Sequence, residues 1–151
     1  MESLVFVCWG NICRSPIAER VAQRMASERG LELNVSSFGL SAENAGSPID
    51  DRAVTVLQQG GYHVDGHSAR QIRREDIEAA SLVVAVEPYQ VDTLRAMAPG
   101  MDNVRLLNDF NPEMDVDTPL IDPWYGDDDG FRDTIADVEA AMPAIIDEFT
   151  P

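Results

Sequence analysis

Near its start the chain reads Leu4-Val5-Phe6-Val7-Cys8-Trp9-Gly10-Asn11-Ile12-Cys13-Arg14-Ser15. The apolar beginning is typical of a strand buried on both faces of a parallel sheet, and it predicts a strand over residues 2–7. Pro16 favours the first turn of a helix, because its ring fixes φ near the helical value. The sequence therefore predicts a strand, a polar loop and a helix, in an order that lets backbone N–H groups of the loop bind an anion.

The polar loop carries a cysteine and an arginine six positions apart, Cys8 and Arg14. Gly10 and Asn11 accept positive φ angles at low cost, so successive loop amides can turn inward around an anion. A thiolate among such amides, with the arginine fork beside it, can attack an electrophile that carries several negative oxygens. A phosphate monoester fits that description best.

Cys8 has a second interpretation, as a structural cysteine buried at the end of an apolar strand. We favour the catalytic interpretation, because the polar side chains of Asn11, Arg14 and Ser15 follow directly and would be poor neighbours in an apolar core.

Apolar patterns in the rest of the chain alternate between strands and helices. We expect further strands over residues 31–37, 81–86 and 104–107, and helices that begin near Ser15, Asp50, Pro88 and Phe131. This alternation predicts an α/β fold of three layers, a four-stranded parallel sheet flanked by helices on both faces. In such folds ligands bind beyond the carboxyl ends of the strands, where the Cys8 loop lies. Residues 108–130 are rich in Pro, Gly and Asp, and we expect an irregular loop there that carries function.

The composition fits a single domain over residues 1–151, since 151 residues with 44% hydrophobic side chains can bury one full core. No apolar run approaches the roughly 20 residues that span a bilayer, and the first residues do not resemble a secretion signal, so we expect a cytoplasmic location. The two cysteines fit a reducing compartment and leave no set of cysteines and histidines for zinc.

Acidic residues outnumber Lys and Arg by 27 to 11, and the net charge is −16. Such a charge argues against nucleic acid or an anionic membrane as a partner, because both would be repelled. An acidic surface is more often a solubility feature than a binding site. An anionic substrate would still have to reach Cys8, so we expect a local positive site at Arg14.

A leaving alcohol needs a proton donor, and Asp122 is the best candidate for that role. It stands in the segment Asp122-Pro123-Trp124-Tyr125-Gly126. Pro123 restricts the backbone beside the carboxylate, and the two aromatic side chains can form a wall for a flat substrate. We interpret Asp127, Asp128 and Asp129 as solvated loop charges.

These features together resemble the low-molecular-weight protein tyrosine phosphatase family over almost the whole chain. The resemblance rests on the loop from Cys8 to Ser15 and on the segment from Asp122 to Gly126. Three further motifs match in order and approximate spacing, namely Ser37-x-Gly39, Gly46-x-Pro48-x-Asp50-x-Arg52-Ala53 and His67-x-Ala69-Arg70-Gln71.

The resemblance implies a protein-tyrosine phosphatase that uses no metal or organic cofactor. Cys8 would attack phosphorus and form a phosphocysteine, Arg14 and the loop amides would hold the phosphoryl group, and Asp122 would act as general acid and then as base. The substrate-binding residues implied in this way are Trp9, Gly10, Asn11, Ile12, Cys13, Ser15, Trp124 and Tyr125.

The resemblance also implies that Ser37 and His67, with Asn11 and Ser15, support the loop through hydrogen bonds, and that Ser15 assists the thiolate. Ordinary roles stay open: a helix cap for Ser15, a strand end for Ser37 and a hydrogen-bonded loop residue for His67. Cys13 is implied to form a reversible disulfide with the nucleophile, with packing beneath the loop as the alternative.

Three positions bear on the substrate. Members of the family usually carry an aromatic residue where this chain has Glu43, so we expect one wall of the cleft to be missing unless Trp9 and Trp124 replace it. Relatives that prefer phosphoarginine have Thr at the place of Ile12, which therefore favours phosphotyrosine. Tyr125 matches tyrosines that are phosphorylated in some relatives, but a wall residue is the role that we favour.

Two other functions compete with this interpretation. An arsenate reductase of the same fold needs relay cysteines, and the chain has none beyond its two. A non-catalytic phosphoprotein-binding module would not need both Cys8 and Asp122. The expected partners are a phosphotyrosine-containing protein and a cognate tyrosine kinase, and the expected assembly is a monomer or weak dimer.

Overall fold

Four parallel strands form the centre of the protein, whose computed structural model describes residues 1–126 and 128–150, except for the side chains of Tyr125 and Asp128. The strands are β1 (Glu2–Cys8), β2 (Leu33–Gly39), β3 (Leu82–Ala85) and β4 (Val104–Leu106), in the spatial order β2-β1-β3-β4. Strand β1 pairs in parallel with β2 and with β3, and β3 pairs with β4. The strand that carries Cys8 at its end is therefore an inner strand.

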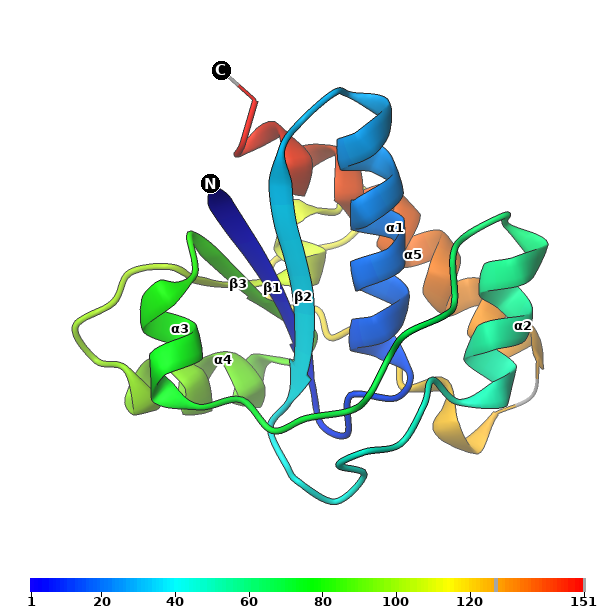
Figure 1. Ribbon diagram of the computed structural model, residues 1–151, viewed down its shortest axis with the longest axis horizontal. Coiled ribbons are helices and arrows are strands. Elements are labelled where there is room, and N and C mark those ends of the chain that lie inside the picture. The colour runs from blue at the N-terminus through cyan, green and yellow to red at the C-terminus, as the bar shows by residue number, and fades with distance from the viewer. Residues whose placement is uncertain (127, 151) are drawn as a thin grey trace.

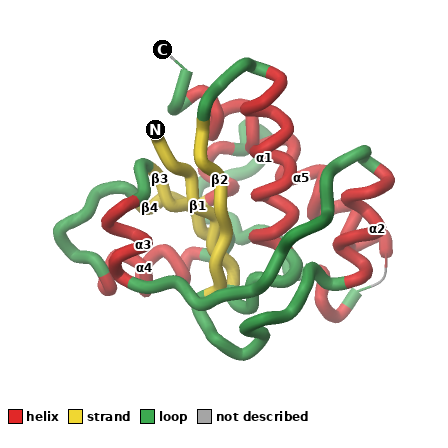
Figure 2. Tube along the Cα trace, viewed as in Figure 1, coloured by secondary structure: helices red, strands yellow, loops and turns green. Residues whose placement is uncertain are grey.

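Helices cover both faces of this sheet (Figure 1). Helices α1 (Arg14–Glu28), α2 (Asp51–Gln59) and α5 (Asp128–Asp147) lie on one side, and α3 (Arg74–Ala79) and α4 (Pro88–Met97) lie on the other (Figure 2). The predicted fold class, a three-layer α/β arrangement around a four-stranded parallel sheet, is confirmed.

Side chains of β1 alternate between two apolar clusters, as the two-residue period of a strand requires. Leu4, Phe6 and Cys8 belong to the cluster that α1 and α5 share, whereas Val5 and Val7 belong to the cluster beneath α4. All five are buried, which is why this strand reads as a continuous apolar run. The alternation directs the Cys8 side chain toward α1.

The structure corrects several expected boundaries. Helix α3 was not expected, because its six residues are too few to show a helical period. Helix α5 begins at Asp128 rather than near Phe131, since two acidic residues form its first turn, where the helix dipole favours them, before the apolar pattern starts. The expected irregular loop over residues 108–130 therefore includes the start of α5 and a short 3₁₀ turn at Pro123–Tyr125.

The earlier start of α5 also corrects the interpretation of the acidic run after Tyr125. Asp129 is exposed and lies in α5, where it pairs with Arg132, so it is not a loop charge. Asp127 and the side chain of Asp128 lie outside the described residues. Among the described residues, no helix is both long and apolar enough to cross a membrane.

The carboxyl ends of β1 and β2 meet at the lower edge of Figure 1, where loops after both strands come together. Gly39, the last residue of β2, holds this edge through two backbone bonds, from its N–H to Arg70 O (2.7 Å) and from the Ile72 N–H to its carbonyl (2.8 Å). A Cβ at position 39 would lie 2.8 Å from the Trp9 carbonyl oxygen. Only glycine allows the β1 loop to approach so closely.

We expect Gly39→Ala to lower the free energy of unfolding by about 1–3 kcal/mol, because a methyl group must displace backbone atoms rather than a flexible side chain. The matched control is Gly100→Ala, since a Cβ at position 100 meets no atom within 4 Å. Urea denaturation of both variants and the parent measures the difference. Equal stability of the two variants would contradict the close approach at Gly39.

Candidate active site

A pocket of about 280 Å³ opens at the carboxyl end of β1. Three segments far apart in sequence supply its polar groups, namely the loop after β1, the segment after β2 and the segment around Asp122. The residues that line it are Cys8, Trp9, Gly10, Ile12, Cys13, Arg14, Glu43, Asn44, Asp122 and Trp124. The pocket thus brings together most of the side chains that the sequence predicts to act.

Asn11 turns the loop back toward the cysteine. Its φ is +61°, in the left-handed region, and its backbone N–H donates to Cys8 Sγ at 3.3 Å. Gly10 does not have the positive φ that the sequence predicts for it. A Cβ at position 10 would lie 2.5 Å from Asn44 Nδ2, which is the end of a side chain that can move aside. The amide at position 11 is therefore turned inward by asparagine rather than by glycine.

Cys8 is almost fully buried and has polar neighbours on the α1 side. Its Sγ lies 3.0 Å from Ser15 Oγ, and both thiols of the chain, Cys8 and Cys13, are free. Ser15 is the second residue of α1, and no side chain caps this helix, so the helix-cap role for Ser15 does not apply. A thiolate at this point would face a hydroxyl, an inward amide and the start of a helix, all of which favour negative charge.

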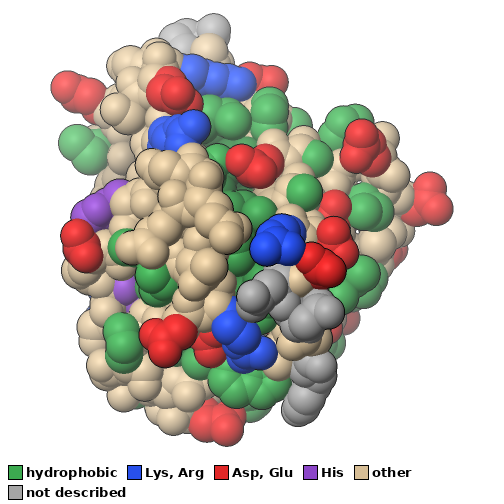
Figure 3. Space-filling model, turned by 90° about the vertical axis from the view of Figure 1, so that its right-hand side faces the viewer, with side chains coloured by type: hydrophobic (Ala, Val, Ile, Leu, Met, Phe, Trp, Pro, Cys, Tyr) green, Lys and Arg blue, Asp and Glu red, His purple; other side chains and the backbone are tan. Residues whose placement is uncertain are grey.

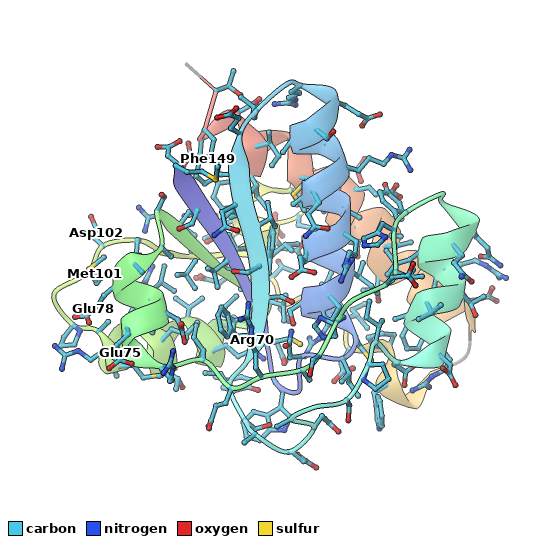
Figure 4. The ribbon with its side chains drawn as sticks, in the orientation of Figure 1. Arg70, Glu75, Glu78, Met101, Asp102 and Phe149 are labelled. Carbon is cyan, nitrogen blue, oxygen red and sulfur yellow. The ribbon has the colours of Figure 1, made fainter. Side chains whose placement is uncertain are left out.

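The side chain of Asn11 is the hub of a hydrogen-bond network. Its Nδ2 donates to Ser15 Oγ (2.9 Å) and to Ser37 Oγ (3.0 Å), and its Oδ1 accepts from the Arg70 backbone N–H (3.1 Å). The ring Nε2 of His67 lies 2.7 Å from the Asn11 carbonyl oxygen. Figure 4 shows Arg70 beside β2, which this network joins to the loop. The four residues expected to support the loop do lie together.

The network corrects the argument that polar residues after Cys8 avoid the core. The exposed fractions are 0% for Asn11, 3% for Arg14 and 0% for Ser15. These side chains are buried because each finds partners, which removes most of the cost of taking a polar group out of water. Glu19, a residue that the sequence did not single out, extends the network by accepting from Ser37 Oγ at 3.1 Å. Ser37 is buried within β2, so it does more than end a strand.

Arg14 is held rigidly beside the pocket. Its Nη1 donates to the Leu120 carbonyl at 2.8 Å, and its Nη2 lies 2.9 Å from Glu87 Oε2 and 3.7 Å from Asp122 Oδ2. Glu87 received no site role from the sequence, although a carboxylate directly after a buried strand is a usable signal. Glu87 follows β3 and thereby reaches the same edge of the sheet as Cys8.

Asp122 is the most exposed of the three central groups, with a side chain 49% exposed. Its Oδ1 accepts from the Trp124 N–H at 3.0 Å, which fixes one oxygen and leaves the other toward Arg14. Such a carboxyl can exchange protons with solvent and with a bound ligand. Its position beside the pocket suits acid–base chemistry.

Both tryptophans stand at the mouth of the pocket, Trp9 with 48% and Trp124 with 42% of its surface exposed. Both line the pocket, as expected if they replace the aromatic residue missing at Glu43, and Trp9 Nε1 donates to Glu43 Oε2 at 3.0 Å. Trp124 is backed by Arg52, whose guanidinium lies 5.0 Å from the indole ring. The side chain of Tyr125 lies outside the described residues, so its role stays a prediction.

Cys13 and Ile12 occupy the inner part of the loop. Burial raises the pKa of the Cys13 thiol well above its ordinary range, and the nearby charge of Asp50 adds to this effect. Ile12 lines the pocket and is partly buried against the core. Among the residues that the structure describes, no cluster of His, Cys, Asp and Glu is suited to hold a metal ion. The guanidinium of Arg14 and the amide of Asn11 are groups suited to bind an anion.

Comparison with known proteins points to one family. A family model described as low molecular weight phosphotyrosine protein phosphatase matches residues 3–150. The low molecular weight protein-tyrosine phosphatase A of Mycobacterium tuberculosis is 38% identical over 151 aligned positions, which cover 95% of this chain and 89% of the relative.

Solved structures agree with the sequence match. A protein tyrosine phosphatase from Entamoeba histolytica superposes with a TM-score of 0.92 at 27% identity, covering 99% of this chain and 97% of that one. The YwlE arginine phosphatase of Bacillus subtilis superposes with a TM-score of 0.86 at 25% identity, covering 97% and 95% of the two chains.

The Asn11 network predicts a stability effect at Ser37. We expect Ser37→Ala to lower the free energy of unfolding by about 1–3 kcal/mol. The Ser37 hydroxyl accepts a bond from Asn11 Nδ2 and donates one to Glu19, and both buried partners lose it in the variant. Ser36→Ala is the matched control, since Ser36 is less buried and lies outside this network. Urea denaturation compares the two, and equal losses would contradict the role of Ser37.

The buried thiol of Cys13 predicts a pH effect. The folded protein keeps this proton at a pH where the unfolded chain, with an ordinary value of 9.0, loses it. The contribution to stability is therefore complete below about pH 9 and declines as the pH rises above it. We expect the free energy of unfolding to fall more steeply above about pH 9 in the parent than in Cys13→Ser.

Tyr62 also lowers the free energy of unfolding as the pH rises, but at higher pH, because burial and its hydrogen bond to Glu139 raise its pKa to about 12. Tyr62 is present in both proteins, so the difference between the two slopes isolates Cys13. Urea denaturation at a series of pH values provides the measurement, and parallel slopes would refute the assignment.

Proposed function

The chain belongs to the low molecular weight phosphotyrosine protein phosphatase family and is a protein-tyrosine phosphatase, and from this premise we propose that Cys8 is its nucleophile. The observation that carries the proposal is the convergence of Cys8, Arg14 and Asp122 on one pocket, with Arg14 Nη2 3.7 Å from Asp122 Oδ2. A thiolate, a cation and a carboxyl together can carry phosphate-ester hydrolysis without a metal, as nucleophile, charge stabiliser and proton donor.

In the first step the Cys8 thiolate attacks phosphorus. An S–P bond forms, the P–O bond to the phenol breaks, and the protonated carboxyl of Asp122 donates its proton to the leaving oxygen. In the second step a water molecule attacks the phosphocysteine while the Asp122 carboxylate accepts its proton. The S–P bond breaks, inorganic phosphate leaves, and the thiolate and the acid are regenerated.

Arg14 and the loop amides would hold the phosphoryl oxygens in both steps. Glu87 and the Leu120 carbonyl fix the guanidinium before substrate arrives, so little reorganisation is needed as charge develops. Asn11, Ser37 and His67 support the loop from behind, and Ser15 Oγ is close enough to donate to the Cys8 thiolate when the phosphate leaves. Trp9, Gly10, Ile12 and Cys13 supply the remaining loop backbone.

We propose phosphotyrosine in proteins as the substrate, with a cognate tyrosine kinase as its source. The exposed rings of Trp9 and Trp124 can contact a flat phenyl group, and Ile12 gives the base of the pocket an apolar side chain. Ile12 is also the reason to favour phosphotyrosine over the substrate of the related arginine phosphatase. We further propose that the enzyme acts in the cytoplasm as a monomer or weak dimer, as its two free cysteines and net charge of −16 suggest.

Two competing functions are weaker. An arsenate reductase relay needs cysteines beyond Cys8 and Cys13, and the chain contains no others. A phosphoprotein-binding module would not need a carboxyl placed beside the phosphate site, as Asp122 is.

Hydrolysis of aryl phosphates tests the proposal. We expect the parent to hydrolyse p-nitrophenyl phosphate and phenyl phosphate at acidic to neutral pH, and Cys8→Ser to hydrolyse neither. Asp122→Asn should lower kcat/KM, which reports the step in which the phenol leaves, by about 10²- to 10⁴-fold for phenyl phosphate. The loss should be much smaller for p-nitrophenyl phosphate, because the more acidic phenol leaves without a proton.

The matched control is Asp92→Asn, which removes one exposed carboxylate from α4 and should behave like the parent. An inactive parent would refute the phosphatase mechanism. Equal losses of kcat/KM with both leaving groups in Asp122→Asn would refute the acid role of Asp122 and leave the role of Cys8 standing.

A further inference from the structure

The segment after β2 is fastened to the active-site loop by backbone bonds. Leu40 N–H donates to the Cys8 carbonyl at 2.9 Å, and Ser41 donates to the Trp9 carbonyl from both its backbone N–H (3.0 Å) and its hydroxyl (3.2 Å). The Glu43 N–H in turn donates to Ser41 Oγ at 3.4 Å. The position of Glu43 is thus set by the same backbone that carries the nucleophile.

This arrangement places the Glu43 carboxylate within reach of one side chain of the pocket, the indole of Trp9. The Nε1–H of Trp9 donates to Glu43 Oε2 at 3.0 Å, while nearly half of the Trp9 surface stays exposed at the mouth of the pocket. An exposed indole on a loop would otherwise sample several rotamers, and substrate binding would have to restrict them. A charge-assisted bond removes part of that cost in advance.

We infer that Glu43 is a positioning residue that sets specificity: it holds the Trp9 indole as one wall of the cleft, so that the site selects phosphate esters of flat aromatic alcohols. The inference rests on the proposed function, since it names how that same pocket chooses its substrate. Glu43 touches no reacting atom, and it acts through the ring of Trp9. Glu43 stands where relatives carry an aromatic residue, and its carboxylate fixes another aromatic side chain, Trp9, at the cleft.

The test separates recognition of the ring from recognition of the phosphoryl group. The probes are p-nitrophenyl phosphate for turnover, and benzylphosphonate and inorganic phosphate for binding by calorimetry. In Glu43→Ala we expect KM for p-nitrophenyl phosphate and Kd for benzylphosphonate to rise roughly three- to tenfold, the effect of one such hydrogen bond. The Kd for inorganic phosphate and kcat should stay within about twofold, because neither depends on the ring.

Three further variants make the test specific. Glu43→Gln keeps an acceptor oxygen and should restore most of the affinity. Glu75→Ala removes one exposed carboxylate from α3 (labelled in Figure 4), a helix that supplies no residue to the pocket lining, and should match the parent. Trp9→Phe keeps a ring without the N–H, and adding Glu43→Ala to it should cause no further loss.

Several results would overturn the inference: unchanged affinity of Glu43→Ala for benzylphosphonate, equal losses in Glu43→Ala and Glu43→Gln, additive losses in the double variant, or a parent that does not bind benzylphosphonate. A gain of affinity in both Glu43→Ala and Glu43→Gln would also overturn the inference, because it would assign Glu43 a repulsive charge effect on the anionic ligand instead. A parent that binds benzylphosphonate in the expected pattern but does not turn over p-nitrophenyl phosphate would refute the catalytic proposal and support the wall.

Discussion

The side-chain amide of Asn11 is bonded on both polar atoms in a loop where its exposed fraction is 0%. This one group joins the loop to helix α1 through Ser15 and to strand β2 through Ser37, while its left-handed backbone turns the N–H toward Cys8. Burying this amide without hydrogen-bond partners would lower the stability of the fold by several kcal/mol. Losing any one partner of Asn11 therefore destabilises the folded loop. Thiol, helix start and inward amide keep their relative positions because Asn11 ties them together.

The position of β1 in the sheet explains why the loop after it needs the hydrogen bonds of Asn11. An inner parallel strand is covered on both faces, so the loop that follows it begins inside the protein and its polar groups must find partners within the chain. The apolar cluster around α1 and α5 includes Cys8, whose Sγ lies 3.0 Å from the hydroxyl of Ser15. A reactive thiol placed there is shielded on one side by apolar packing and open on the other to the pocket.

Much of this arrangement could be read from the sequence, for identifiable reasons. Strand β1, the loop and α1 follow from local patterns, and the convergence of Cys8, Arg14 and Asp122 follows from topology and family resemblance. Helix α3 and the first turn of α5 are too short or too acidic to show a helical period. No local pattern assigns Glu87 or Glu19 to the site, because each belongs to it through one contact across the fold. Glu87 contacts Arg14, and Glu19 contacts Ser37.

Two carboxylates, Glu87 and Asp122, share the guanidinium of Arg14 unequally. The surface mixes carboxylates with fewer arginines, as one face shows (Figure 3), and Arg14 itself lies between Glu87 and Asp122. Glu87 is only 29% exposed and bonded directly to Arg14, whereas Asp122 is 49% exposed and lies 3.7 Å away. A phosphate dianion entering beside Arg14 would meet Asp122, the more exposed and more distant of the two carboxylates, rather than Glu87, which is bonded directly to the guanidinium. Glu87 would thus keep Arg14 in place in both steps, and Asp122 is the carboxyl left to face the leaving oxygen.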